Sequence, residues 1–130
     1  MLHLRDEIMF IPSFLYCTRF DGKPSDIREW LPIIKQTAGD TKFAIVETSW
    51  TAEDEYGGGE GVQADYVYEV FCMKDYFGEQ LEYVCWFTEC DLIEEAFRGL
   101  KLFRQSGLIS YEGVEREAWW KWVELAEKKQ

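Results

Sequence analysis

Two neighbouring stretches, residues 64–73 and 80–88, place an apolar side chain at every second position, and this pattern constrains the fold most. Such spacing is typical of half-buried strands, and the intervening Asp75–Gly78 has the composition of a turn. The pattern predicts a β-hairpin in which Lys74 pairs with Glu79 across the turn. One face of this hairpin is wholly apolar and is expected to lie in the core. Its residues are Tyr66, Tyr68, Val70, Cys72, Leu81, Tyr83, Cys85 and Phe87.

The opposite face of the predicted hairpin mixes large apolar side chains with carboxylates. Its residues are Asp65, Val67, Glu69, Phe71, Met73, Glu82, Val84, Trp86 and Thr88. Such a mixture is neither an ordinary core face nor an ordinary solvated face. We therefore interpret this face as a candidate binding surface.

Two further strands and three helices complete the prediction. Strands are expected at residues 13–20 and 43–50, and helices at residues 26–38, 91–105 and 113–129. The resulting order is β-α-β-β-β-α-α. It predicts an α+β fold with a four-stranded mixed or antiparallel sheet and helices packed on one face.

Capping residues and a proline predict where two of these helices begin or break. Asp26, followed three residues later by Glu29, matches a capping box, and Pro32 predicts a break near Leu31. Asp91 is expected to cap the next helix in the same way. The apolar stripe of that helix, which includes Phe97 and Leu100, is expected to cover the hairpin.

Charge is concentrated in one region of the chain. Between Phe43 and Phe97 there are fourteen carboxylates and one cation, Lys74, whereas the first forty-two residues are neutral and the last thirty-three carry +2. This region favours cationic partners and repels nucleic acid and anionic membranes. Residues 51–63 are glycine-rich but contain no Lys or Arg, so they are expected to form a mobile acidic loop and not a phosphate-binding loop.

The composition predicts one cytoplasmic domain over residues 1–130, with residues 1–12 frayed. A hydrophobic fraction of 47% excludes intrinsic disorder, and no apolar run approaches the ~18–20 residues of a membrane span. The four cysteines lack Cys-x-x-Cys spacing and the only histidine is His3, so we expect reduced thiols, no metal and no cofactor.

A catalytic role finds little support in the residue types. Glu69 and Glu82 would lie diagonally on the mixed hairpin face, where two carboxylates can shift each other's pKa and share acid–base chemistry, and Glu47 or Asp65 could extend the set. The chain has no nucleophile motif and no histidine near these acids. We therefore predict that the protein is not an enzyme.

One segment carries a resemblance. Thr18-Arg19-Phe20-Asp21-Gly22, followed by residues 26–31, resembles the strand, turn and helix that begin many small phage and prophage proteins of unassigned function. The resemblance covers residues 18–31 and implies a phage origin, with the host cytoplasm as the site of action. It implies no functional residue.

The acidic character and the mixed hairpin face together predict a protein-binding module. We expect an inhibitor of the phage anti-defence type that covers a basic surface of a nuclease or nucleic-acid-binding enzyme. A toxin immunity protein is an alternative, and so is a structural module that forms a homodimer through Val67, Phe71, Val84 and Trp86. The predicted partner-binding residues are Glu53, Asp54, Glu55, Glu60, Asp65, Glu69, Phe71, Glu82 and Trp86.

Overall fold

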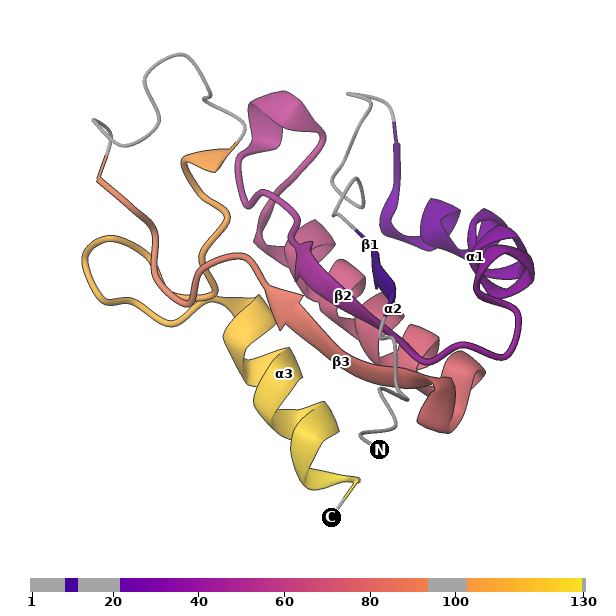
Figure 1. Ribbon diagram of the computed structural model, residues 1–130. Coiled ribbons are helices and arrows are strands. Elements are labelled where there is room, and N and C mark those ends of the chain that lie inside the picture. The colour runs from indigo at the N-terminus through magenta and orange to yellow at the C-terminus, as the bar shows by residue number, and fades with distance from the viewer. Residues whose placement is uncertain (1–8, 12–21, 94–102, 130) are drawn as a thin grey trace.

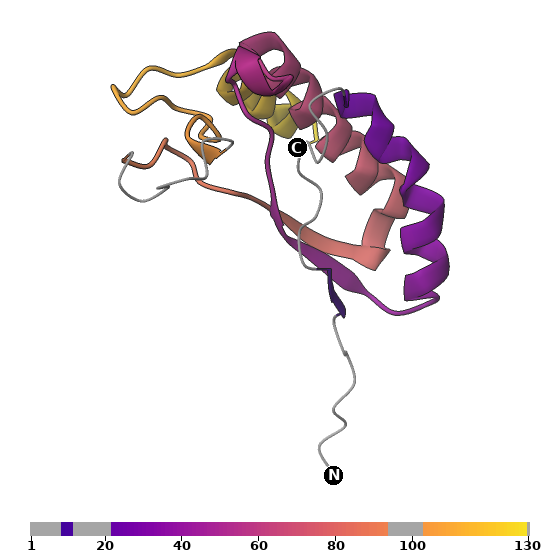
Figure 2. The same cartoon turned by 90° about the horizontal axis from the view of Figure 1, so that it is seen from above.

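The computed structural model describes residues 9–11, 22–93 and 103–129, which form a parallel sheet with helices on one of its faces (Figures 1 and 2). The strand order is β1-β2-β3. The elements in chain order are β1 (Met9–Ile11), η1 (Pro24–Glu29), α1 (Leu31–Ala38), β2 (Phe43–Thr48), η2 (Asp54–Tyr56), α2 (Glu60–Phe77), η3 (Gly78–Gln80), β3 (Leu81–Trp86) and α3 (Glu117–Glu127). The η elements are short 3-10 helices.

The predicted fold class is wrong. The described strands pair only in parallel, and helices alternate with strands along the chain, so the order is β-α-β-α-β-α. A parallel neighbour requires a crossover connection, which α1 supplies between β1 and β2 and α2 supplies between β2 and β3. The expected four-stranded mixed or antiparallel sheet is therefore replaced by an α/β layer arrangement.

The predicted hairpin fails because its first strand is a helix. Residues 64–73 lie in the middle of the 18-residue helix α2. The stretch carries apolar side chains at both period-two and helical spacings, so local pattern alone does not separate the two structures. The buried side chains of α2 recur at intervals of three or four residues, as expected for one side of a helix. They are Gln63, Ala64, Tyr66, Val67, Glu69, Val70, Met73 and Phe77.

The second predicted strand exists as β3, but most of its side chains face the opposite way from the prediction. Phe43 pairs with Leu81 and Ile45 with Val84, so β3 has an extra residue between these pairs. Val84 and Trp86 consequently pack against the core, whereas Tyr83 remains 42% exposed. The hairpin residues expected inside divide into three groups. Tyr66, Val70 and Leu81 are buried, Cys72 and Phe87 are half-buried, and Tyr68, Tyr83 and Cys85 are exposed.

Two apolar clusters hold the layers together. The first lies between the sheet and the helices α1 and α2, with Phe43, Ile45 and Leu81 from the strands. The second lies between α2 and α3 and includes Val67 and Ala118. Inside the first cluster the hydroxyls of Thr48 and Tyr66 are 2.7 Å apart, so a polar pair in the core is satisfied.

Several local predictions are confirmed. The helical segment breaks near Leu31, because η1 ends at Glu29 and α1 begins at Leu31 with Pro32 in its first turn, where a missing N–H costs nothing. The helix α1 ends at Ala38, and Gly39, whose φ is +57°, is its C-cap. Asp26 is not the cap, however: Lys23 is, and its backbone N–H donates to the Asp26 carboxylate at 2.9 Å.

Other predictions differ from the structure or lie outside it. The strand at 43–50 is confirmed as β2, and the terminal helix is confirmed over a shorter span as α3. Asp91–Ile93 is not helical, so Asp91 caps no helix there. The predicted strand at 13–20, most of residues 1–12 and the stripe containing Phe97 and Leu100 lie outside the described residues.

Candidate functional site

The carboxyl edge of the sheet gathers the segments that follow β2 and β3, and functional sites of open parallel sheets usually lie at this edge. The helices α2 and α3 also begin here. They pack in parallel, since Ala64 near the start of α2 clusters with Ala118, and Lys129 at the far end of α3 binds Asp75 at 2.6 Å. Two helix N-termini therefore point to the same edge (Figure 1).

The connection between β2 and α2 is folded against the core. The buried Gln63 side chain donates through Nε2 to the carbonyl oxygens of Trp50 at 2.9 Å and Gly107 at 3.1 Å. A Cβ at Gly58 would lie 2.2 Å from the Thr51 carbonyl oxygen, so only glycine fits there. The predicted loop 51–63 is thus shorter than expected, because α2 already begins at Glu60.

A buried ion pair ties two later segments together at this edge. Arg116 donates to both carboxylate oxygens of Asp91, at 2.6 and 2.9 Å, and to the Gly107 carbonyl at 2.6 Å. The Gly107 N–H in turn donates to Asp91 at 2.9 Å. Both charged side chains are about as buried as core residues, at 5% and 6% exposure. Arg116 is therefore a structural clamp with its charge neutralised.

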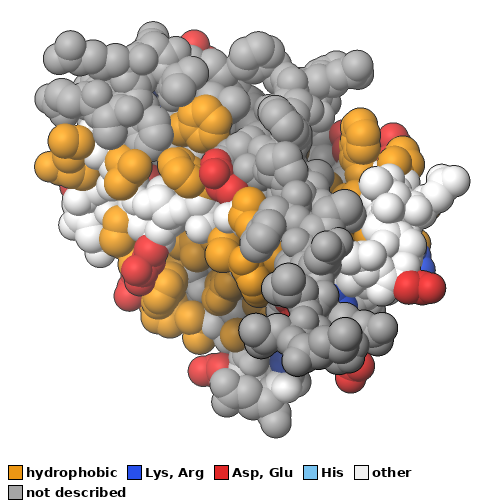
Figure 3. Space-filling model, in the orientation of Figure 1, with side chains coloured by type: hydrophobic (Ala, Val, Ile, Leu, Met, Phe, Trp, Pro, Cys, Tyr) orange, Lys and Arg blue, Asp and Glu red, His pale blue; other side chains and the backbone are white. Residues whose placement is uncertain are grey.

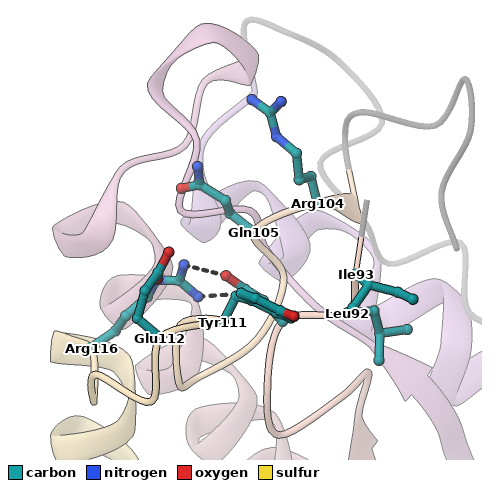
Figure 4. Close-up of a pocket in the computed structure, with 8 residues that line it drawn as sticks. Leu92, Ile93, Arg104, Gln105, Tyr111, Glu112 and Arg116 are labelled. Carbon is teal, nitrogen blue, oxygen red and sulfur yellow. Dashed lines mark hydrogen bonds and ion pairs between the residues drawn. The ribbon is translucent and has the colours of Figure 1, made fainter. Parts of the chain in front are cut away.

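The second arginine of the edge is engaged as well. Arg104 forms an ion pair with Glu53, whose side chain is largely buried. In Figure 4 the Arg104 side chain points away from Arg116. Neither arginine offers the unpaired positive charge that a phosphate ligand needs.

A pocket of about 600 Å³ opens between these segments (Figure 4). Its apolar walls are exposed: Leu92 by 40%, Ile93 by 51% and Tyr111 by 65%. The full lining is Asp91, Leu92, Ile93, Arg104, Gln105, Tyr111, Glu112 and Arg116. The pocket thus combines apolar walls with the neutralised Arg116–Asp91 pair.

Acidic side chains are concentrated at the same edge. Residues 49–60, 87–93 and 103–117 hold nine carboxylates and two arginines, a net charge of −7. The segments at the amino edge, residues 38–42, 74–82 and 121–129, hold six carboxylates and five lysines, a net charge of −1. On the face shown in Figure 3, hydrophobic and acidic side chains lie together with little blue between them. Among these segments, the net negative charge at the carboxyl ends of the strands is therefore larger than that at their amino ends.

Six acids of the carboxyl edge form no ion pair within the described part of the chain. They are Asp54, Glu55, Glu89, Glu112, Glu115 and Glu117. Glu60 is 54% exposed and lies 3.9 Å from the Arg116 guanidinium, while Glu117 lies beside Gly61 at the start of α2. Acids near helix N-termini are favoured by the helix dipole. The acids outside the helices, such as Glu89 and Glu112, have no such structural explanation.

The structure separates the predicted partner-binding residues. Glu53, Asp54, Glu55 and Glu60 lie together at the carboxyl edge, and Asp65 is exposed on α2. The other predicted residues share no common surface, because the hairpin face that was to carry them does not exist. They are Glu69, Phe71, Glu82 and Trp86.

Each of these four residues is engaged within the chain. Glu69 is buried and accepts two hydrogen bonds from Arg28, at 2.7 and 2.8 Å. The rings of Phe71 and Trp86 lie 5.3 and 6.2 Å from that of Trp122, respectively. Glu82 binds Lys42 at 2.8 Å.

The hairpin face expected to carry the alternative homodimer surface does not form either. Val67 is fully buried, and Phe71, Val84 and Trp86 pack against the core clusters of their own chain. Val67 therefore cannot contact a second copy in this fold, and Phe71, Val84 and Trp86 are only partly exposed.

The hairpin face that would have placed Glu69 and Glu82 together as an acid–base pair does not form. Glu69 and Glu82 bind different cations, Arg28 and Lys42, on different elements. Within residues 9–11, 22–93 and 103–129 no three His, Cys, Asp or Glu side chains are grouped to hold a metal. Cys72, Cys85 and Cys90 are free thiols.

The sequence pattern did not identify the acids of residues 112–117 as part of the acidic carboxyl edge. Glu112, Glu115 and Glu117 precede Lys121, Lys128 and Lys129, so the net charge of that part hides a separation of acids from lysines. The order of charges was the available signal: acids lie before the helix or at its start, and lysines follow toward its end. Because the two ends of a helix lie at opposite edges of the molecule, this order predicts that the acids and the lysines are separated in space. Leu92, Ile93 and Tyr111 carried no comparable signal.

A titration prediction follows from the Lys42–Glu82 pair. The hydrogen bond and charge of Lys42 lower the pKa of Glu82, so its stabilising effect is present above the unfolded-state pKa and lost as pH falls through the folded-state value. Lys42→Gln should raise the pKa of Glu82 in an NMR titration. Lys128→Gln is the control: it should raise the pKa of Glu124, which Lys128 lowers, and leave Glu82 unchanged. An unchanged Glu82 pKa in Lys42→Gln would contradict the pairing.

Comparison of the chain with protein-family models, with curated proteins and with solved structures finds no match. Among the described residues, no helix combines the length and the apolar character that crossing a membrane requires. Function must therefore be argued from the carboxyl edge itself.

Proposed function

We propose that this protein is an acidic binding module whose carboxyl edge covers a basic, nucleic-acid-binding surface of a nuclease or related enzyme and thereby inhibits it. The supporting observation is the charge asymmetry between the edges, −7 against −1. Carboxylates that take the positions of phosphates compete with nucleic acid for the same cationic surface and accelerate association.

The local geometry favours a macromolecular partner over a small anion. Among the described residues of this edge, Glu53 and Asp91 neutralise the two arginines, so in that part of the chain an anionic ligand would meet unpaired acids and no free cation. The buried Gln63 side chain and the Arg116–Asp91 pair hold the connecting segments in place. A surface held in this way loses little conformational entropy when it binds.

A phage inhibitor of a host nuclease and an immunity protein for a toxin would use this edge in the same way. A direct test is a binding screen against purified basic nucleases and nucleic-acid-binding domains, with a DNA or RNA duplex as competitor. The proposal expects bound partners to be released by the duplex and their nuclease activity to fall as this protein is added. Binding that no duplex competes with would contradict it.

Charge reversal at the edge should slow association. Asp54→Lys, Glu55→Lys and Glu112→Lys combined should reduce the association rate constant about tenfold or more at low ionic strength, with the effect shrinking as salt is added. Glu53 is left intact because its pairing with Arg104 is structural. Stopped-flow or biolayer measurements of the rate constant against salt concentration provide the check.

The matched control reverses three exposed acids at the amino edge, Asp40→Lys, Glu79→Lys and Glu127→Lys. It changes the net charge by the same amount, so any effect of total charge alone appears equally in both variants. Equal slowing by the two variants would show that the carboxyl edge has no special role.

A further inference from the structure

The pocket at the carboxyl edge exposes more apolar surface than its surroundings explain. Singly exposed apolar side chains are normal on a protein surface, but Leu92, Ile93 and Tyr111 line one hollow of about 600 Å³. A volume in the hundreds of cubic ångströms is typical of sites that enclose a ligand group. In Figure 4, Tyr111 is drawn between Arg116 on one side and Leu92 and Ile93 on the other.

The charges around the pocket indicate what could enter it. The guanidinium of Arg116 is bound by Asp91, and Arg104 is bound by Glu53, so the polar groups of the lining are largely satisfied. Glu112 in the lining forms no ion pair among the described residues, and the half-exposed Glu60 lies beside Arg116. The pocket thus has an apolar part, formed by Leu92, Ile93 and Tyr111, beside polar groups that are largely paired.

We infer that this pocket receives one large apolar side chain of a partner protein, projecting from a segment rich in lysine and arginine. The inference rests on the proposed function and adds its recognition element. Charge complementarity selects a basic segment, whose cations would pair with Glu112, Glu60 and their acidic neighbours. An apolar anchor surrounded by a polar rim is the arrangement in which a few residues dominate the affinity of an interface.

Specificity would then come from two separable contributions. The acids attract any cationic segment at long range, whereas the pocket discriminates among cationic segments by the side chain that they present. The two contributions respond to different changes in the peptide and in the protein, which makes the inference testable before the natural partner is identified.

The experiment uses three short synthetic peptides. The first is composed of Lys, Arg and Gly with a central Phe, the second has Gly in place of Phe, and the third keeps Phe but has Glu in place of Lys and Arg. Affinities are measured by calorimetry at low ionic strength, and the methyl signals of Leu92 and Ile93 are followed by NMR. We expect the Phe-containing basic peptide to bind about tenfold more tightly than its Gly counterpart and to shift both methyl signals.

Variants of the pocket walls complete the test. Ile93→Ser combined with Tyr111→Ser should remove the preference for Phe while leaving the affinity for the Gly-containing peptide unchanged. Ile33→Ser is the control, because Ile33 is 54% exposed on α1, outside the pocket lining. All variants replace exposed side chains, and an unchanged melting temperature verifies that they fold.

The outcomes separate this inference from the proposed function. Equal binding of the two basic peptides would overturn the pocket inference, and so would a preference for Phe that persists in the pocket variants. Neither result would contradict the proposal that the acidic edge binds a basic partner. Failure of both basic peptides to bind, or equally tight binding of the acidic peptide, would overturn both.

Discussion

Arg116→Met should lower the free energy of unfolding by about 3–5 kcal/mol, since it leaves a buried carboxylate without its counter-ion. Asp91 has only 6% of its side chain exposed and receives two hydrogen bonds from Arg116. The substitution also removes the donor to the Gly107 carbonyl. Equilibrium unfolding in urea, with the midpoint and slope compared to the unmodified protein, measures the loss.

Two further variants test whether the loss of stability comes from the unpaired buried charge. Combining Arg116→Met with Asp91→Leu removes both charges, and much of the lost stability should return because no buried charge remains unpaired. Lys121→Met breaks an exposed ion pair with Glu124 and should change stability by less than about 1 kcal/mol. A loss below about 1 kcal/mol for Arg116→Met itself would show that the Arg116–Asp91 pair does not hold the edge together.

Trp86→Ala should also cost about 3 kcal/mol, because the half-buried indole packs against both apolar clusters. Its ring lies 6.0 Å from that of Tyr66 and 6.2 Å from that of Trp122, so it joins the two apolar clusters. Its Nε1–H donates to the Ser106 carbonyl at 2.9 Å, which links β3 to the carboxyl edge. Thermal and urea unfolding monitored by circular dichroism provide the measurement.

The neighbouring Tyr83→Ala is the matched control. Tyr83 belongs to the same strand but is 42% exposed, so its loss should cost less than about 1 kcal/mol. The hairpin predicted from sequence assigns these residues to opposite faces, with Tyr83 inside and Trp86 at a binding surface. A large loss for Tyr83→Ala with a small one for Trp86→Ala would therefore favour the hairpin register over the parallel sheet.

The carboxyl edge combines groups that stabilise the fold with the proposed binding surface. Thr88, a β-branched residue two positions after the end of β3, has a φ of +63°. Such a conformation costs about 1–3 kcal/mol and persists only when its surroundings impose it. Its hydroxyl donates to the Cys90 carbonyl at 2.6 Å. Together with the Arg116–Asp91 pair, this turn positions Leu92 and Ile93 at the pocket. Destabilising the clamp should therefore weaken binding even where no acid is changed.

Local chemistry was sufficient to predict some elements. Pro32 lacks the N–H that a helix interior needs, so the break before α1 could be read directly from the sequence. β2 and α3 were also predictable, because Phe43 to Trp50 and the tryptophans of the C-terminal segment each follow one clear pattern. In these segments the local preference and the final packing agree.

The segment 64–73 shows where local pattern is insufficient. Tyr66 and Val70 belong to both the period-two and the helical apolar sets, and Val67 belongs only to the helical one. Tertiary packing selects the helix, because that structure buries Val67 against α3 while Tyr66 and Val70 face the sheet. The choice between strand and helix therefore depends on partners that are distant in sequence.

The charge of the chain and its acidic segment around Glu53–Glu60 are properties of the sequence, because formal charge is simply additive along a chain. The location of those charges is not. Only the parallel packing of α2 and α3 brings Glu112, Glu115 and Glu117 to the edge occupied by Asp54 and Glu55, and only η1 brings Arg28 to neutralise Glu69. Proximity depends on how helices and strands pair in space, and that pairing is decided by burial across the whole molecule.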